Sequence, residues 1–327
     1  MTLYLIDKYV WDFWTFRKGD LHHIFYLQAP RTPNDPDLRH ACASVGHAIS
    51  PDLIRWELMP DALHPGQPGS WDDRAIWTGC VLEKDNLYYM FYTSSSYSDG
   101  GKTQRIGLAT SEDLINWKRH PANPVLEADP QWYEKIGDPG VSEESWRDPY
   151  IVYDIDSNQY NALICAREKN GPSDGRGVIG CARSHNLIEW EVLPPLYATG
   201  EFSFMEVPQL ITIGDRVYLL FSVGEEWHSL KRRTRLADQS ANLCGMYVLS
   251  FDHITGEYKM CSEYGLLADE KGTYYAGKIV FNSTGDPSIL ATRQYDNTGQ
   301  YLGGLTDPIS VGFDTEGKLQ IENHSDE

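Results

Sequence analysis

Residues 50–56 read Ser50-Pro51-Asp52-Leu53-Ile54-Arg55-Trp56, and this pattern returns along the chain. It recurs as Ser111-Glu112-Asp113-Leu114-Ile115-Asn116-Trp117 and as Ser184-His185-Asn186-Leu187-Ile188-Glu189-Trp190. A degenerate copy is Phe251-Asp252-His253-Ile254-Thr255-Gly256-Glu257-Tyr258, and a faint fifth is Phe313-Asp314-Thr315-Glu316-Gly317-Lys318-Leu319. The aromatic residues of the first four copies lie 61 to 73 residues apart. Five units of about 65 residues therefore account for the chain, and such an internal repeat predicts a repeating architecture.

Each repeat also contains segments that favour β-strands. Runs rich in β-branched and aromatic residues predict a central strand at residues 23–27, 87–93, 160–166, 217–223 and 288–292. A second strand leads into each of the first four copies of the pattern, at residues 42–49, 105–110, 178–183 and 245–251. Helical periodicity is nowhere sustained. We therefore predict an all-β fold, a five-bladed β-propeller with four-stranded antiparallel blades around a central channel. A two-sheet sandwich is the alternative, but it gives no reason for the repeat.

Composition and charge exclude several classes of function. The chain has 327 residues, of which 41% are hydrophobic and 12% aromatic, so it can fill a large core and is not a disordered protein. Its net charge is −19, which argues against nucleic acid as a partner because such binding needs a positive surface. The same charge disfavours a polyanionic substrate, so a neutral substrate is the easiest fit.

The cysteines and the apolar segments bear on location and cofactors. The six cysteines are scattered and contain no C-x-x-C pair, so we expect no metal, and nothing in the sequence calls for a cofactor. There is no basic leader followed by an apolar stretch and no run of about 18 apolar residues. We therefore expect a soluble cytoplasmic protein with reduced thiols that does not enter a membrane.

The beginnings of the five repeats hold the residues expected to be functional. In a propeller the innermost strand of each blade lines the channel, and the channel mouth collects residues from every blade. The innermost strand should open each repeat, where the sequence reads Trp11-Asp12, Trp77-Thr78-Gly79, Trp146-Arg147-Asp148-Pro149, Met205-Glu206-Val207-Pro208 and Tyr274-Tyr275-Ala276-Gly277. Three of these five openings carry an acid. Each acid alone could be an ordinary strand-edge residue, but their shared placement indicates a site.

These motifs resemble those of the glycoside hydrolase family 32 propeller and of its relative, family 68. Residues His47-Ala48, the pattern at 50–56, Phe91-Tyr92-Thr93 and Asn123-Pro124-Val125 match the family along most of the chain. Arg147-Asp148-Pro149 resembles its R-D-P motif and Glu206-Val207-Pro208 its E-C-P motif. The usual first motif, W-M-N-D-P-N-G, is absent, and Trp11-Asp12-Phe13-Trp14 is closer to the W-D-x-W of the family 68 fructosyltransferases. Trp77-Thr78-Gly79 stands where the family has S-G-S. The chain ends after the fifth repeat, so we expect one propeller domain over 1–327, without the C-terminal β-sandwich of family 32.

The resemblance implies roles for the three acids in a retaining cleavage of a glycosidic bond. It makes Asp12 the nucleophile, Glu206 the acid/base and Asp148 a stabiliser that hydrogen-bonds sugar hydroxyls. Such enzymes need one carboxyl group to protonate the leaving oxygen and another to attack. We expect Asp12 to be ionised in an open, polar setting. We expect the apolar neighbours of Glu206 to raise its pKa, and Arg147 to hold Asp148 charged and oriented.

Other residues have weaker claims. Trp11, Trp77 and Tyr274 or Tyr275 could stack against a sugar or could be ordinary core aromatics. Asp72 or Asp73 could bind a hydroxyl group, although turn chemistry explains both equally well. Glu201 is the rival of Glu206 as the acid. His22 and His23 are expected to be structural.

The run Lys231-Arg232-Arg233-Thr234-Arg235 is the one basic cluster of the chain. Its ordinary interpretation is a solvated loop. The alternatives are a contact for a phosphorylated sugar or for another subunit, and the sequence does not give the oligomeric state.

The preferred function is a retaining hydrolase of a terminal β-fructofuranosyl linkage, as in sucrose or a short fructan. The alternatives are a furanosidase for another sugar such as arabinofuranose, a fructosyltransferase, and a non-catalytic sugar-binding propeller. Three intact acids argue against the last, because a binding protein has no need of a matched acid and nucleophile.

Overall fold

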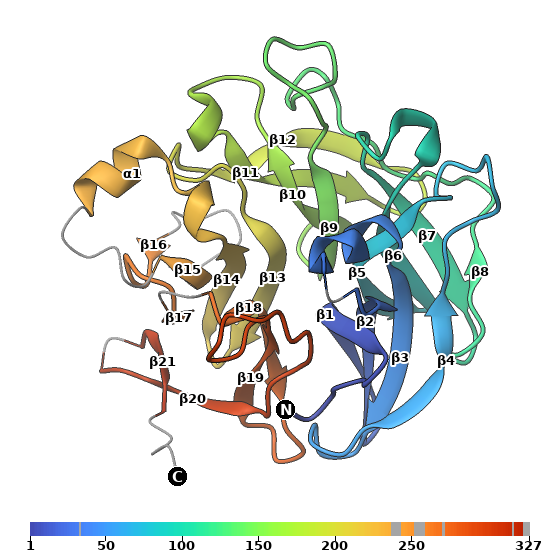
Figure 1. The fold of residues 1–327 in the computed structure, drawn as a ribbon, viewed down its shortest axis with the longest axis vertical. Coiled ribbons are helices and arrows are strands. Elements are labelled where there is room, and N and C mark those ends of the chain that lie inside the picture. Colours follow the sequence, from blue (N-terminus) through green and yellow to red (C-terminus); the bar gives the residue numbers. More distant parts are fainter. Residues whose placement is uncertain (33, 237–242, 252–258, 270–271, 316, 323–327) are drawn as a thin grey trace.

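Each repeat forms one antiparallel sheet, and the five sheets are arranged as blades around a channel in the computed structural model (Figure 1). The structure describes residues 1–327 except 33, 237–242, 252–258, 270–271, 316 and 323–327. The first blade has β1 (Lys8–Lys18), β2 (Leu21–Pro30), β3 (Ser44–Ser50) and β4 (Glu57–Leu63). The second has β5 (Ala75–Lys84), β6 (Leu87–Ser95), β7 (Arg105–Ser111) and β8 (Lys118–Arg119). The third has β9 (Trp146–Asp154), β10 (Gln159–Arg167), β11 (Gly177–Ser184) and β12 (Glu191–Ala198).

The last two blades follow the same order. The fourth has β13 (Glu206–Ile213), β14 (Arg216–Val223), β15 (Cys244–Phe251) and β16 (Lys259–Met260), and β17 (Leu267–Asp269) also pairs with β15. The fifth has β18 (Tyr274–Phe281), β19 (Pro287–Arg293), β20 (Ile309–Phe313) and β21 (Leu319–Ile321). Short helices occupy the loops: η1 (Pro36–Ala41), η2 (Tyr97–Asp99), η3 (Ser173–Gly175), η4 (Glu225–Trp227) and α1 (Leu230–Arg235). The prediction of a five-bladed propeller is confirmed. The expected absence of a β-sandwich stays a prediction.

The first strand of each blade is the innermost, as predicted. Neighbouring inner strands are in contact in chain order, and β18 contacts β1, so the ring is closed. The N-terminal segment strengthens this closure, because Leu3 forms a β-bridge with Leu305 of the fifth blade. Arg31, just beyond β2, donates hydrogen bonds to the carbonyl oxygens of Leu5 (2.8 Å) and Leu302 (2.7 Å). The first and last repeats are therefore held together by backbone pairing as well as by packing.

The repeated pattern forms the turn between the third and fourth strands of a blade. Asp52 Oδ1 accepts hydrogen bonds from the backbone N–H groups of Ile54 (3.0 Å) and Arg55 (2.9 Å). The leucine of the pattern has a positive φ and is fully buried in each intact copy: 63° at Leu53, 69° at Leu114 and 70° at Leu187. A left-handed backbone is uncommon for leucine, and the hydrogen-bonded turn together with burial holds it there.

The two weaker copies end differently. Residues 252–258 of the fourth copy lie outside the described residues. The fifth copy lies between β20 and β21, where the backbone N–H of Asp314 bonds to the carbonyl oxygen of Lys318 at 3.0 Å. In the four blades where it is described, the pattern is therefore a local turn signal that marks the outer edge of the blade.

Two general features bear on the sequence-based expectations. Within the described residues, no helix is long and apolar enough to cross a membrane. All six cysteines are unpaired.

The turn makes a testable prediction about stability. Leu53 is fully buried whereas its neighbour Ile54 is 55% exposed. Truncating a buried leucine leaves a cavity, so Leu53→Ala should lower the free energy of unfolding by about 2–5 kcal/mol. Ile54→Ala removes as many carbon atoms from the same turn and should change it by only about 0.5 kcal/mol. Chemical denaturation measures both, and equal losses would show that burial of the leucine does not anchor the turn.

Candidate active site

Every inner strand carries a β-bulge near its beginning. In β1 the extra residue is Asp12 and in β5 it is Thr78; neither has a partner residue on the adjacent strand, and the register shifts there. In the other three blades two residues face one: Asp148-Pro149 in β9, Val207-Pro208 in β13 and Ala276-Gly277 in β18. A bulge bends the strand and redirects a side chain. Five bulges at one level therefore turn residues from all five blades toward the channel mouth.

The bulges hold backbone conformations that cost free energy. Asp148, Val207 and Ala276 have φ values of 58°, 45° and 50°, and such positions in non-glycine residues cost about 1–3 kcal/mol each. In β5 the residue after the bulge is Gly79, where a Cβ atom would lie 2.0 Å from the carbonyl oxygen of Phe91. Strain of this kind is concentrated at functional sites, and here it lies at the residues that were expected to be functional.

A threonine of the second blade ties the bulges of the second and third blades together. The hydroxyl group of Thr93 in β6 donates to the carbonyl oxygen of Thr78 at 3.0 Å. It also accepts the backbone N–H of Asp148 at 2.8 Å. The second and third blades are thereby fixed to each other at the level of the site. This explains the place of Thr93 at the end of the Phe91-Tyr92-Thr93 motif.

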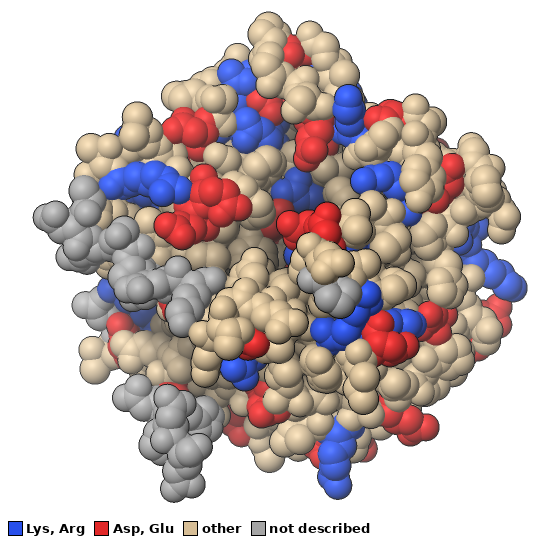
Figure 2. Space-filling view, in the orientation of Figure 1, with Lys and Arg blue, Asp and Glu red and all other residues tan. Residues whose placement is uncertain are grey.

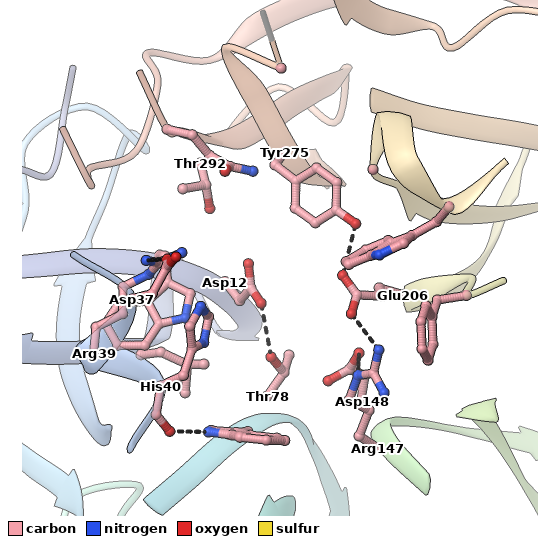
Figure 3. A pocket seen from close by; sticks show the side chains of 18 of the residues that line it. Asp12, Asp37, Arg39, His40, Thr78, Arg147, Asp148, Glu206, Tyr275 and Thr292 are labelled. Atoms are coloured by element: carbon pink, nitrogen blue, oxygen red, sulfur yellow. Dashed lines mark hydrogen bonds and ion pairs between the residues drawn. The ribbon is translucent and has the colours of Figure 1, made fainter. Parts of the chain in front are cut away.

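The redirected residues line a cavity of about 680 Å³ at the mouth of the channel (Figure 3). Its wall includes Asp12, Asp148 and Glu206, which come from three different blades. Figure 3 shows the three carboxyl groups pointing into one space. Of the other residues expected to contact a sugar, the wall includes Trp11, Trp77, Arg147 and Tyr275.

Tyr274 is the exception, and its expected contact with the sugar is corrected here. It does not line the cavity but packs against the apolar core between the fourth and fifth blades. Side chains alternate along a strand, so only one of two adjacent tyrosines can face the channel. That residue is Tyr275, whose hydroxyl group donates to Glu206 Oε2 at 2.7 Å.

Asp12 has electrostatic surroundings that differ from those expected. The pKa of Asp12 is raised to about 7, mainly by burial and also by the charges of Asp148 and Glu206, while Arg39 and Lys278 oppose the shift. The Thr78 hydroxyl lies 3.4 Å from Asp12 Oδ2. The expectation of an open setting that keeps Asp12 ionised is therefore wrong, because three carboxyl groups share one confined space.

Asp148 is buried beside Arg147. Burial raises the pKa of Asp148 to about 6, although the Arg147 charge and the backbone N–H of Val207 favour its ionised form. Arg147 Nε lies 3.7 Å from Asp148 Oδ2, and that oxygen accepts the Val207 N–H at 3.1 Å. The predicted contact between Arg147 and Asp148 is present, but it is the longer of two ion pairs.

The shorter ion pair joins Arg147 to Glu206. Arg147 Nη2 lies 2.5 Å from Glu206 Oε1, while Tyr275 bonds the other carboxyl oxygen. The predicted apolar surroundings of Glu206 are therefore wrong. Its neighbours in sequence, Met205 and Val207, are buried in the core, whereas its own side chain faces the polar cavity.

The rival acid lies in a separate cluster. Glu201 does not line the cavity, and its carboxyl oxygens bond Arg232 (2.6 Å) and Arg235 (2.8 Å). Arg232 is fully buried and stacks on the ring of Phe202, with its charge 4.8 Å from the ring centre. The interpretation of residues 231–235 as a solvated loop is therefore wrong. They form α1, and three of its arginines bond neighbouring carboxyl or carbonyl oxygens.

The remaining candidates have structural partners. Asp72 is buried and bonds Arg119 at 2.6 Å, and Asp73 accepts the backbone N–H groups of Gly69 and Tyr97. Neither lines the cavity, so turn chemistry accounts for both. His23 Nδ1 lies 3.0 Å from His47 Nε2 in a buried stack.

Sequence reasoning missed several residues of the wall. They come mainly from loops between blade strands: Asp37, Arg39, His40, Gln104, Glu143, Phe204, Glu225, Glu226, Trp227, Tyr295 and Tyr301. The inner strand starts at the mouth and the second strand returns to it, so the loop after each second strand must lie there. Arg39 is buried, pairs with Asp37 at 2.7 Å and stacks 4.1 Å from the ring centre of Tyr301. The sequence could have indicated Arg39, because it lies in the loop that follows the second strand of the first blade.

The arrangement of the three carboxyl groups is suited to acid–base chemistry. Among the described residues, no group of three or more His, Cys, Asp and Glu side chains is placed to hold a metal ion. Two acids on opposite sides of one space, with tryptophan and tyrosine rings around them, can hold a sugar between a nucleophile and a proton donor.

Comparisons with known proteins agree with this geometry. Residues 15–301 match the family model for the glycosyl hydrolases family 32 N-terminal domain. The chain is 24% identical over 325 residues to an insoluble β-fructofuranosidase isoenzyme of Arabidopsis thaliana, covering 94% of this chain and 55% of that protein. It is 28% identical over 218 residues to a sucrose-6-phosphate hydrolase of Zymomonas mobilis, covering 63% of this chain and 38% of that protein.

A solved structure shows the same fold. An inulosucrase from Halalkalicoccus jeotgali bound to kestose superposes with a TM-score of 0.77 at 19% identity, covering 97% of this chain and 87% of that one. The chain spans about half or less of the length of these two curated relatives. The matched stretch begins at residue 15, beyond Asp12, in agreement with the unusual first motif. The chain belongs to glycosyl hydrolases family 32, on the evidence of a family model that matches most of its length.

Proposed function

We propose that this protein is a retaining glycoside hydrolase that removes a terminal β-fructofuranosyl unit from sucrose or a short fructan. The observation that carries the proposal is the convergence of Asp12, Asp148 and Glu206 from three inner strands on one cavity. The β-fructofuranosidase relative supports the choice of sugar. A cavity of about 680 Å³ suits a small ligand, for which pockets of about 300–1,000 Å³ are usual.

The reaction divides between two carboxyl groups. The ionised carboxylate of Asp12 attacks the anomeric carbon while Glu206 protonates the departing oxygen, which gives a glycosyl ester of Asp12 and the free leaving alcohol. Glu206 then takes a proton from water, the water oxygen attacks the anomeric carbon, and Asp12 leaves as a carboxylate. Asp148 hydrogen-bonds the sugar hydroxyls, and Arg147 holds Asp148 and Glu206 in place.

The rim of the cavity favours a substrate without a phosphate group. Among the described residues, four acids line it, Asp37, Glu143, Glu225 and Glu226. Figure 2 shows acidic side chains beside the hollow. The two arginines of the wall already have carboxylate partners: Arg39 pairs with Asp37, and Arg147 pairs with Glu206. We therefore propose a neutral disaccharide or oligosaccharide as substrate, and neither nucleic acid nor a membrane as partner.

The first test is a substrate panel with products followed by NMR. We expect release of fructose from sucrose, inulin and levan oligosaccharides, with the β configuration in the first-formed sugar because a covalent ester on Asp12 gives net retention. Preferred cleavage of arabinofuranosides would assign another sugar. Growth of fructosyl oligomers in place of free fructose would assign a transferase. If no sugar of the panel is converted, the protein would be a non-catalytic sugar-binding propeller.

The second test separates Glu206 from Glu201. Glu206→Ala should lose about 10²–10⁴-fold on sucrose, whose leaving group needs a proton, and far less on fructosyl fluoride or a nitrophenyl fructoside. Glu201→Ala removes a partner of the buried Arg232, so it should lower the melting temperature while affecting both substrate types alike. Dependence on the leaving group in the Glu201 variant, and not in the Glu206 variant, would reverse the assignment.

The third test concerns the charge of the substrate. Wild-type kcat/KM should be about tenfold lower for sucrose 6-phosphate than for sucrose, because the phosphate must approach several carboxylates. Raising the salt concentration should reduce this difference, since exposed charges are screened. The double change of Glu225→Gln and Glu226→Gln should reduce it as well. A preference for the phosphorylated sugar in the wild-type protein would contradict the proposal.

A further inference from the structure

The channel continues beyond the catalytic cavity, and its next layer contains a buried lysine. A second cavity of about 90 Å³ is lined by Trp14, Thr15, Cys80, Val81, Tyr150, Ile151, Gln209 and Lys278. These residues lie two to three positions further along the same inner strands as Asp12, Thr78, Asp148, Glu206 and Tyr275. The second cavity therefore lies directly beneath the layer of bulges. Within the described part of its wall, Lys278 is the only side chain that is normally charged.

Lys278 holds the bulge that follows Glu206. Its side chain reaches from β18 to β13, where Nζ donates to the carbonyl oxygens of Val207 (2.6 Å) and Pro208 (3.0 Å). Val207 has a φ of 45°, and its N–H bonds Asp148. The ammonium group thus fixes a strained backbone segment in direct contact with two of the three catalytic acids.

Lys278 also acts on Asp12, which has no ion pair among the described residues. Arg147 pairs with Asp148 and Glu206, whereas Asp12 has the Thr78 hydroxyl as its hydrogen-bond donor. Among the described residues, the charges of Arg39 and Lys278 favour the ionised form of Asp12. Lysine 278 is only 6% exposed, so water screens this effect little.

We propose that Lys278 is a positioning residue of the hydrolase: from beneath the cavity its ammonium group fixes the bulge beside Glu206 and favours the carboxylate form of Asp12. This inference rests on the proposed function in assigning Asp12 as the nucleophile. If the proposal holds, the reaction depends on the charge of Lys278 as well as on its hydrogen bonds.

The described charged and titratable groups around Asp12 and Lys278 come from several blades. Asp12 faces Asp148 on β9, Glu206 on β13, Lys278 and Tyr275 on β18, Arg39 on η1, and Tyr301 of the fifth blade. Lys278 faces Asp12, Asp148, Cys80 and Tyr150. Burial lowers the pKa of Lys278 to about 8, and the two aspartates oppose that shift. The lysine is therefore still a cation at the pH where Asp12, with a pKa of about 7, becomes ionised.

The test is the acid limb of the profile of kcat/KM against pH. Asp12 must be ionised to attack, and its pKa lies above the ordinary value, so activity falls as the pH falls through about 7. Lys278→Met removes the cation, raises the pKa of Asp12 further, and should move this limb to higher pH by about 1 unit. Lys278→Arg should keep it near its wild-type position.

A matched control separates charge from structure. Gln209 also joins β13 to β18, since its amide exchanges hydrogen bonds with the backbone of Ile279 at 2.9 and 2.8 Å, but it carries no charge. Gln209→Leu should lower stability and kcat without moving the acid limb. An unmoved limb in Lys278→Met, or an equal shift in Gln209→Leu, would overturn the proposal.

A second measurement does not depend on turnover. The carboxyl ¹³C signal of Asp12, assigned by its loss in Asp12→Asn, should titrate about 1 unit higher in Lys278→Met than in the wild type. Lys278→Gln, which keeps a donor but no charge, serves if the methionine variant does not fold and should shift the signal in the same direction. Failure of the proposed function would appear as no cleavage of the sugar panel while this shift is still seen. An unshifted signal would contradict the role of Lys278 and would leave the proposed function standing.

Discussion

The site depends on one constraint: each of the five inner strands leaves its regular pairing at the same level of the channel. A regular strand would point alternate side chains into the packed space between blades, and the acids would be separated by apolar neighbours. The extra residue in each bulge reverses this phase locally, so Asp12, Thr78 and Asp148 turn to the mouth. The positive φ values at Asp148 and Val207 are the conformational cost of that turn. Thr93 and Lys278 oppose that cost with hydrogen bonds from neighbouring blades.

The same convergence creates an electrostatic problem. Three carboxyl groups in one cavity disfavour their simultaneous ionisation, and burial adds to the effect, so the pKa values of Asp12 and Asp148 are both raised. Arg147 reduces the repulsion at Asp148 and Glu206, because its guanidinium group forms ion pairs with both carboxyl groups. Within the described residues Asp12 has no such contact, which suits its proposed role as nucleophile because a carboxylate held in a tight ion pair would be less free to attack. The cations that act on it do so from a distance, Arg39 from the rim and Lys278 from below.

The parts of the structure that the sequence predicted are those set by local chemistry. The turn around Asp52 and Leu53 forms from its own hydrogen bonds and one buried side chain, so it marks the blades without knowledge of the tertiary fold. The turns divide the chain into repeats, and the start of each repeat gave the position of its innermost strand. Asp12, Asp148 and Glu206 were located in this way. Tyr274 could not be separated from Tyr275 in this way, because a bulge two residues later shifts the phase of the strand. Arg39 and Lys278 were missed because their importance arises only when the first and fifth blades meet, and the polar setting of Glu206 likewise comes from Arg147 of another blade.

The basic cluster at residues 231–235 shows that a run of charged residues, which usually indicates a solvated loop, can be buried by tertiary contacts. Arg232 is wholly buried between the rings of Phe202 and Tyr247 and bonds Glu201. Glu201 and Phe202 belong to the segment that leads into β13, and the N–H of Ser203 in that segment bonds the carbonyl oxygen of Trp227. Phe204 follows and lines the cavity, and Glu206 begins the strand. An isolated arginine would be too costly to bury, so its ion pairs and ring contacts must form together with this segment. The charges of α1 therefore fix the segment that leads to Glu206, the proposed acid/base, and they act on the site through the backbone.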